Sequence, residues 1–324
     1  MKIRTIAAAL ALACLSVNAS AQAWPAKPVR LVLGFPPGSA PDTITRLLAD
    51  KFTAQIGQTF IVDNRPGAAA TIAATQVAQS PADGYTIMVA LAASMATAVH
   101  LLPSAKYHPV KDFAPIGFIQ RGPYYIAVPA DSAINSFPDL LAAAKAKPGE
   151  INYASPGVGT QHHLTWELIQ LQTGTKLTHV PLSGTAVMLT ETITGRTHVN
   201  LDGAGVQFAS QVKAGKLKLV GMTGARPLPI FPGIRPIREQ GLDLLSHSWW
   251  GLVAPAGTPR EIITRMNTEL NKALASSDVI DRLSAEGAIT DGTPGSTPEE
   301  FGKWIQTEYE RWGKVIKDVG LKLN

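Results

Sequence analysis

Cysteine is nearly absent from this sequence, since Cys14 is the single one among its 324 residues. One cysteine forms no internal disulfide, and removal of the N-terminal segment would leave no thiol at all. No stretch after that segment is apolar for long enough to cross a membrane as a helix. Runs of four or more basic residues are also missing, so the pI of 9.3 does not indicate a nucleic-acid partner.

The motifs of common catalytic sites are missing as well. There is no Gly-x-Ser-x-Gly, no Walker lysine loop and no His-Glu-x-x-His. Gly157 and Gly159 follow a predicted strand, but His162 occupies the third glycine position of a dinucleotide fingerprint. His163 and Glu167 lie four residues apart, and two ligands without a third nearby are too few for a metal. The sequence therefore predicts no catalytic residue, no metal site and no cofactor.

Residues 1–23 have the pattern of a secretory signal peptide. Lys2 and Arg4 precede the apolar residues 6–17, and Ala-x-Ala patterns at 19–21 and 21–23 predict cleavage before Gln22 or Trp24. Cleavage before Cys14, as in a lipoprotein, is an alternative that the preceding residues fit poorly. Removal of the two basic residues lowers the formal charge from +5 to +3. We predict a soluble exported protein, most simply a periplasmic one.

Strand and helix patterns alternate along the rest of the chain. Residues 29–33, 59–62 and 85–90 predict strands, and they are separated by helical patterns at 44–52 and 68–78. This order predicts a parallel sheet covered by helices. A second α/β series starts at residue 137. Its predicted helices and strands, with the helices that end the chain, are 138–147, 151–154, 161–173, 177–180, 186–194, 198–201, 217–221, 249–254, 260–275, 277–286 and 298–319.

Loops of small residues follow several of these strands. Residues 34–39 lead into a helix that Ser39 or Asp42 can cap and whose first turn suits Pro41. Residues 155–160, Ser-Pro-Gly-Val-Gly-Thr, have the same build. Free backbone N–H groups and the helix dipole at such a helix start favour an anion. Because ligands of open α/β sheets gather at the carboxyl ends of strands, two such lobes would enclose a ligand cleft.

Several residues near these loops have a structural interpretation beside the functional one. Asp42, Asn64 and Asp202 each end a strand or start a helix, where capping is the simpler role. His162 lies nearest the second loop and can either bind an anion or pack. Trp249 and Trp250 point to opposite faces of a strand, so one is expected in the core while the other can wall a cleft.

Five motifs, in order along the chain, carry a resemblance to a known family. They are Phe35-Pro36-Pro37-Gly38 with Asp42, Asn64-Arg65-Pro66-Gly67-Ala68, Asp83-Gly84-Tyr85-Thr86, residues 154–160 with His163-Leu164, and residues 250–259. Together they resemble the extracytoplasmic receptors of tripartite tricarboxylate transporters, also called Bug receptors. The chain departs from the family pattern at Ser39 and at Ala69-Ala70, where glycines are usual, and at Pro41.

The resemblance implies an α/β periplasmic-binding-protein (Venus flytrap) fold, in which two α/β lobes enclose a ligand cleft. The first lobe would comprise residues 24–124 and 246–324, and the second residues 125–245. Such receptors bind a small carboxylate through backbone groups and bridging waters and deliver it to membrane permease subunits. The resemblance thus implies a monomeric binding protein that is not an enzyme.

We expect the carboxylate at the helix starts of Gly38-Ser39 and Gly159-Thr160, with an aromatic or other apolar body against Phe35 and one tryptophan. The predicted ligand-binding residues are Phe35, Gly38, Ser39, Asn64, Ala93, Ser94, Gly157, Gly159, Thr160, His162, Ser183, Gly184, Thr185, Asp202 and Trp249. Two other functions remain open. A periplasmic hydrolase or lyase would use His162 or His163, and a sensory receptor would pass its signal to a kinase. The missing nucleophile motif argues against the enzyme.

Overall fold

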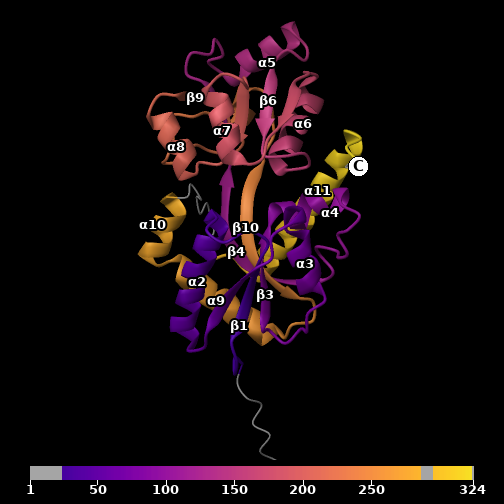
Figure 1. The fold of residues 1–324 in the computed structure, drawn as a ribbon, viewed down its shortest axis with the longest axis vertical. Helices are drawn as coiled ribbons and strands as arrows, with labels where there is room; N and C mark the ends of the chain where they lie inside the picture. Colours follow the sequence, from indigo (N-terminus) through magenta and orange to yellow (C-terminus); the bar gives the residue numbers. More distant parts are fainter. Residues whose placement is uncertain (1–23, 286–294, 323–324) are drawn as a thin grey trace, which may run out of the picture.

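The computed structural model describes residues 24–285 and 295–322, so the predicted signal peptide lies outside the described residues. Two five-stranded sheets, each flanked by helices, form two lobes along the long axis of the molecule (Figure 1). We call them lobe 1, which holds the first strand, and lobe 2. No helix of the described residues is long and apolar enough to span a membrane.

The sheet of lobe 1 has the strand order β2-β1-β3-β10-β4. These strands are β2 (Phe60–Asn64), β1 (Val29–Leu33), β3 (Thr86–Leu91), β10 (His247–Pro255) and β4 (Phe113–Pro123). β1 runs parallel to β2 and β3, whereas β10 runs antiparallel to both β3 and β4. The prediction of a parallel sheet is therefore only partly right, because β10 returns from the other lobe.

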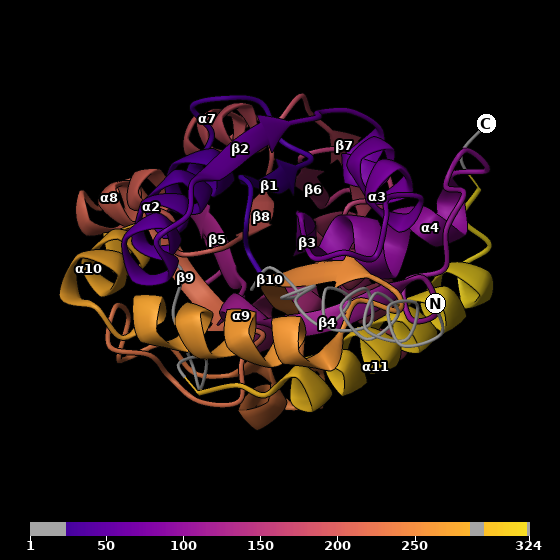
Figure 2. The same ribbon diagram turned by 90° about the horizontal axis from the view of Figure 1, so that it is seen from below.

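Helices cover both faces of this sheet, because neighbouring residues of a strand point to opposite sides. Val29, Leu31 and Leu33 pack with α2 (Ala40–Ile56), α9 (Arg260–Leu274) and α10 (Ser277–Ala285). Val32 packs on the other face with α3 (Thr71–Ala78) and α11 (Pro298–Asp318). Figure 2 shows the two groups of helices on either side of the strands. All six residues of β3 are buried, as expected of a strand covered on both faces.

Lobe 2 is built in the same way, with the strand order β7-β6-β8-β5-β9. Its strands are β7 (Thr178–Pro181), β6 (Asn152–Ser155), β8 (Val199–Asp202), β5 (Tyr125–Pro129) and β9 (Leu217–Met222). Its helices are α5 (Phe137–Ala146), α6 (Gln161–Thr173), α7 (Thr185–Ile193) and α8 (Val206–Lys213). The sequence patterns did not predict β4 or α8.

Two chain crossings join the lobes. β4 leads through Tyr124 directly into β5, and β10 returns beside it, with His247 paired to Pro123. The two crossings are hydrogen-bonded to each other in the region between the lobes around Tyr124, Thr223 and Ser246, which we call the waist. Thr223 Oγ1 donates to the carbonyl oxygen of Ser246 at 2.5 Å, and the backbone N–H of Tyr124 donates to Thr223 Oγ1 at 2.9 Å. The architecture is thus two α/β lobes joined at one waist.

One predicted helix starts later than the sequence indicates. Alanine has the highest helix propensity, so residues 68–78 predict one continuous helix. In the structure Ala68, Ala69 and Ala70 have φ values of 46°, 52° and 67°, and α3 begins at Thr71. A Cβ atom on Gly34 would lie 2.2 Å from the Cβ of Ala70, so the turn is packed tightly against the end of β1. Tertiary packing overrides the local preference here.

Candidate functional site

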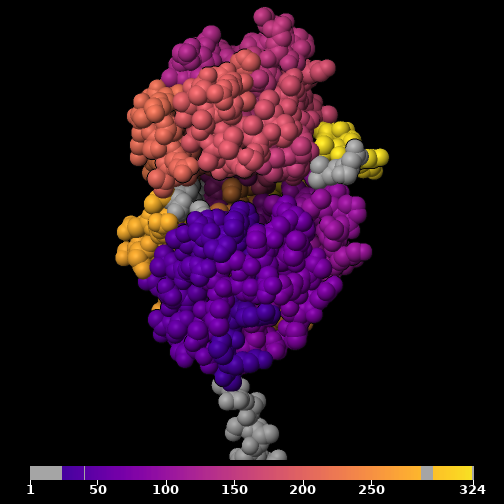
Figure 3. All heavy atoms as spheres, viewed as in Figure 1, coloured from indigo at the N-terminus to yellow at the C-terminus, as the bar shows by residue number. Residues whose placement is uncertain are grey.

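The carboxyl ends of parallel strands from both lobes face each other across the waist. β5 leaves lobe 1 and runs away from it, and β8 is antiparallel to β5, so β6, β7 and β8 run back toward lobe 1. β10 enters lobe 1 from the waist, and β3 is antiparallel to it, so β1 and β3 run toward lobe 2. Figure 3 shows a hollow between the lobes, with orange atoms of the β10 region visible inside it.

The lobe-1 loop, residues 34–42, is held by one buried carboxylate. Asp42 is 3% exposed and accepts hydrogen bonds from the Gly38 N–H (2.9 Å), Asn64 Nδ2 (2.8 Å) and Arg46 Nε (3.0 Å). Burial alone would raise the pKa of Asp42, but these three donors together lower it below its ordinary value. Asn64 Nδ2 also donates to the Phe35 carbonyl oxygen at 3.0 Å. Asp42 and Asn64 therefore shape this loop.

Ser39 is the N-cap of α2, which decides between the two predicted caps, Ser39 and Asp42. Its Oγ accepts from the Asp42 N–H at 3.4 Å and donates to the Pro36 carbonyl oxygen at 2.8 Å. Pro41 removes one backbone donor from the first turn, and the Gly38 N–H is bonded to Asp42. The donors of this helix start are therefore largely used within the loop itself.

The lobe-2 loop, residues 155–160, is held by a hydroxyl and two imidazoles instead. Ser155 Oγ lies 2.6 Å from His179 Nε2 and accepts from the Gly157 N–H at 3.2 Å. The Gly159 N–H donates to His163 Nδ1 at 3.0 Å, and the two imidazoles stack with centroids 3.9 Å apart. Burial, followed by the neighbouring His163, lowers the pKa of His179 to about 4. The loop is therefore framed by the Ser155 hydroxyl and two stacked imidazoles.

Thr160 is the N-cap of α6. Its Oγ1 accepts from the His163 N–H at 3.4 Å and donates its own proton to the Gly157 carbonyl oxygen at 2.8 Å. The hydroxyl proton is thus used within the loop, which favours the capping role over direct ligand binding. The N–H groups of Gln161 and His162, next in the helix, have no acceptor among the described residues. They are the anion donors that this helix start offers.

His162 and Asp202 come together on the lobe-2 side of the waist. His162 Nε2 lies 3.8 Å from Asp202 Oδ1, and both side chains are mostly buried, 16% and 15% exposed. The His162 ring also contacts the Tyr124 ring, with centroids 4.7 Å apart. Burial raises the pKa of the Tyr124 phenol, and the nearby Asp202 carboxylate raises it further. The structure thus brings together two predicted site residues that are 40 positions apart in the sequence.

The remaining predicted residues differ in accessibility. Ser183 and Thr185 are exposed beside the uncapped start of α7, where Gly184 has a φ of 130°. Ser94 is fully buried in a π-helical turn, η2 (Ala93–Thr97), and its hydroxyl donates to the Leu91 carbonyl oxygen at 3.1 Å. The uncapped start of α7 therefore leaves backbone donors toward the waist, whereas the Ser94 hydroxyl is used internally.

Of the two tryptophans, the structure buries the one predicted as a ligand contact. Trp249 is 0% exposed and packs against Phe301, with ring centroids 5.8 Å apart. Trp250 is partly exposed and packs with the cluster that also contains partly buried Phe35. Trp250 therefore replaces Trp249 as the tryptophan of this pair that a ligand can reach. The choice follows from which face of β10 meets α11.

The sequence analysis missed a polar network that links the lobes. Gln161, the first residue of α6, donates to Glu308 of α11 at 3.3 Å and accepts from Tyr124 Oη at 3.1 Å. Glu308 is 3% exposed; burial raises its pKa, against the opposing effects of Arg311 and the Trp312 indole. The position of Glu308 in the sequence could have indicated its burial, because it falls at helical spacing within the apolar stripe of α11. The buried residues of this stripe are Phe301, Ile305, Glu308, Trp312 and Val315.

Metal and catalytic alternatives gain no geometric support. Residues 24–285 and 295–322 contain no group of three His, Cys, Asp or Glu side chains that could hold a metal ion. His163 is engaged by the Gly159 N–H and lies 3.6 Å from Glu167. Ser155 and His179 form a serine–histidine pair, but the serine is fully buried and the histidine has a lowered pKa, which makes a poor nucleophile and base.

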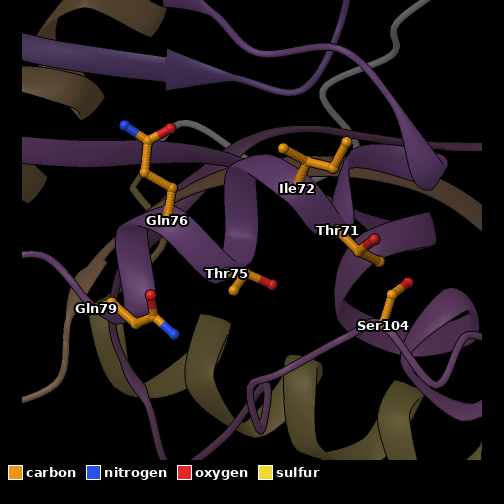
Figure 4. Close-up of a pocket in the computed structure, with 6 residues that line it drawn as sticks. All are labelled: Thr71, Ile72, Thr75, Gln76, Gln79 and Ser104. Atoms are coloured by element: carbon orange, nitrogen blue, oxygen red, sulfur yellow. The ribbon is translucent and has the colours of Figure 1, made fainter.

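A separate depression of about 550 Å³ lies on the outer side of α3 (Figure 4). It is lined by Thr71, Ile72, Thr75, Gln76, Gln79 and Ser104. None of these side chains is ionisable, so the depression offers no charged side chain to a carboxylate.

The family comparison agrees with this geometry. Residues 44–321 match the model of the "Tripartite tricarboxylate transporter family receptor". The "UPF0065 protein in tcbD-tcbE intergenic region" of Pseudomonas sp. (strain P51) is 34% identical over 99% of this chain and 96% of its own length. BugT of Bordetella pertussis is 30% identical, over 97% of this chain and 96% of its own.

Solved structures show the same fold. The Rhodopseudomonas palustris protein Rpa4515, described with adipate, has a TM-score of 0.78 at 33% identity and covers 92% of this chain and 99% of its own. MatC of the same organism, described with bound malate, has a TM-score of 0.76 at 28% identity over 90% and 100%. The predicted periplasmic-binding-protein fold is confirmed, and the chain belongs to the receptor family of the tripartite tricarboxylate transporters.

Proposed function

We propose that the protein captures a small organic carboxylate between its lobes and delivers it to the permease subunits of a tripartite tricarboxylate-type transporter. One observation carries the proposal: β1, β3, β6 and β8 all end at the waist, and in lobe 2 helices with free first-turn N–H groups start there. Such helix starts favour anions. The relatives described with adipate and malate support a carboxylate as the ligand.

The protein acts, in this proposal, as a monomer in the periplasm after removal of residues 1–23. Residues 24–124 with 246–324 form lobe 1, and residues 125–245 form lobe 2. The hydrogen bonds of Thr223 with Tyr124 and Ser246 support these boundaries, because they join the two crossings where the sheets separate. N-terminal sequencing of protein released by osmotic shock tests export. A chain that still begins at Met1 would contradict it.

Binding without turnover is the experimental signature of this function. A true ligand at a hundredfold excess over its Kd should stabilise the protein by about 2.7 kcal/mol. Thermal melting with a panel of carboxylates and their neutral amides should show stabilisation by acids only, since amides gain little from helix dipoles. Native mass spectrometry of protein taken directly from cells identifies the natural ligand. A stabilising acid that is consumed in excess over protein would establish an enzyme instead.

A further inference from the structure

A carboxylate side chain lies inside a site proposed to bind anions. Asp202 ends β8, the central strand of lobe 2, at the edge that faces lobe 1. Oδ1 of Asp202 accepts from the Gly203 N–H at 2.8 Å and lies 3.8 Å from His162 Nε2. The second oxygen, Oδ2, accepts no hydrogen bond from the residues that the structure describes. A ligand in the waist would meet this oxygen.

The loops after β6, β7 and β8 carry few other ionisable side chains, whereas Arg226 lies in the loop after β9, which also ends at the waist. In residues 155–163, 181–188 and 202–206, the ionisable side chains are His162, His163 and Asp202, with no lysine or arginine. His163 is already engaged, since its Nδ1 accepts from the Gly159 N–H and its Nε2 lies 3.6 Å from Glu167. Among the loops after β6, β7 and β8, His162 and Asp202 are therefore the ionisable pair that is left for a ligand.

A negative oxygen at this position discriminates between ligands. A ligand's second carboxylate placed beside Asp202 would be repelled, because like charges a few ångströms apart disfavour each other. A hydroxyl or ammonium group would donate to Oδ2, and hydrogen bonds to charged groups are among the stronger ones in proteins. The carboxylate of the same ligand would lie at the N–H groups of Gln161 and His162.

We infer that Asp202 selects carboxylates that carry a hydroxyl or ammonium group next to the acid over matched acids that lack one. The inference rests on the proposed function, because it assumes that a carboxylate lies at the waist. It goes beyond that function because it names the class of ligand and the residue that recognises it.

Matched pairs of ligands test this selection by titration calorimetry. The probes are butyrate with 2-hydroxybutyrate, succinate with malate, and succinate with aspartate. The wild type should bind at least one donor-bearing member about tenfold or more tightly than its partner. In Asp202→Asn, which keeps the shape and removes the charge, that ratio should fall about tenfold, most for the ammonium compound.

Asp131→Asn is the matched control. Asp131 follows β5, which runs antiparallel to β8, so it lies at the opposite edge of lobe 2, where it is exposed. Its substitution should leave every ratio unchanged. Equal affinities within all pairs in the wild type would overturn the inference without any variant, as would an unchanged ratio in folded Asp202→Asn. If no carboxylate binds the wild type at all, the proposed function itself fails, and the inference with it.

Discussion

The two loops that face each other across the waist have the same outline but different internal chemistry. In lobe 1, the ionised carboxylate of Asp42 gathers one N–H group and two side-chain donors. In lobe 2, the hydroxyl of Ser155 and the imidazoles of His163 and His179 hold the loop, and no carboxylate accepts from its backbone N–H groups among the described residues. Similar strand–loop–helix backbones can therefore be held by groups that respond differently to mutation and pH.

The loops of the two lobes also differ in which residues have positive φ values. Lobe 2 places glycine at its left-handed loop positions, with φ values of 139° at Gly157, 76° at Gly159 and 130° at Gly184. Lobe 1 also has glycines at such positions, Gly38 (80°) and Gly67 (130°), but it adds three consecutive left-handed alanines at residues 68–70. A left-handed conformation is unfavourable for alanine by roughly 1–2 kcal/mol per residue. Lobe 1 thus stores strain at its side of the waist where lobe 2 does not.

The largest expected effect is the loss of the lobe-1 carboxylate. Asp42→Ala leaves the Gly38 N–H, Asn64 and Arg46 without their shared acceptor, and should lower the free energy of unfolding by about 3 kcal/mol. Urea denaturation at neutral pH measures it. Asp50→Ala is the control, since Asp50 is exposed on the same helix and should change stability by about 0.5 kcal/mol or less. Equal effects of the two variants would show that Asp42 does not hold the loop.

Acidification should weaken the two loops in different pH ranges. Because His179 has a folded pKa of about 4 against an ordinary 6.5, the unfolded chain binds its proton first, and stability falls as the pH drops from about 6.5 to 4. Asp42 has a folded pKa below its ordinary 3.8, so its contribution is present above that value and is lost only at still lower pH.

Denaturation curves between pH 7 and 3 separate the two contributions. His179→Gln should flatten the slope of stability against pH between about 6.5 and 4, because glutamine does not titrate. His198→Gln provides the control, as His198 is an exposed histidine of the same lobe. A slope that persists in His179→Gln and disappears in the control would assign the proton uptake elsewhere.

The two N-caps, Ser39 and Thr160, allow the most direct comparison of the loops. Ser39→Ala and Thr160→Val should each lower the free energy of unfolding by about 1 kcal/mol, the usual loss for a capping side chain. Ligand affinity should stay within about twofold for both, because both hydroxyl protons are donated inside their own loops. Calorimetric titration beside thermal melting tests this. A tenfold loss of affinity in Thr160→Val with unchanged melting would place that hydroxyl on the ligand.

The smallest expected effect is a gain in stability. Ala69→Gly removes left-handed strain from lobe 1 but frees the unfolded chain, so the net gain should be about 0.5–1 kcal/mol. Ala78→Gly, at the right-handed end of α3, should instead lose about 1 kcal/mol. Chemical denaturation of the two variants side by side gives both values. Destabilisation by Ala69→Gly would mean that the turn is not strained.

Much of the local structure was predictable because neighbouring residues decide it. The strand at Val29–Leu33, the caps Ser39 and Thr160, and the bounds of α6 follow from patterns a few residues long. The family was predictable for the same reason, since its motifs lie in these short loops. The site was predictable as a set of loops, although the function of each side chain within them was not.

Only tertiary structure decided which side chains share each loop. Asp42 and Asn64 are 22 residues apart, Ser155 and His179 are 24, and Gln161 and Glu308 are 147. Packing of α11 against one face of β10 buried Trp249 rather than Trp250, and close packing against Gly34 accompanies the left-handed alanines of residues 68–70. Local patterns report propensity and periodicity, whereas these outcomes depend on burial and on partners brought together only by the complete fold.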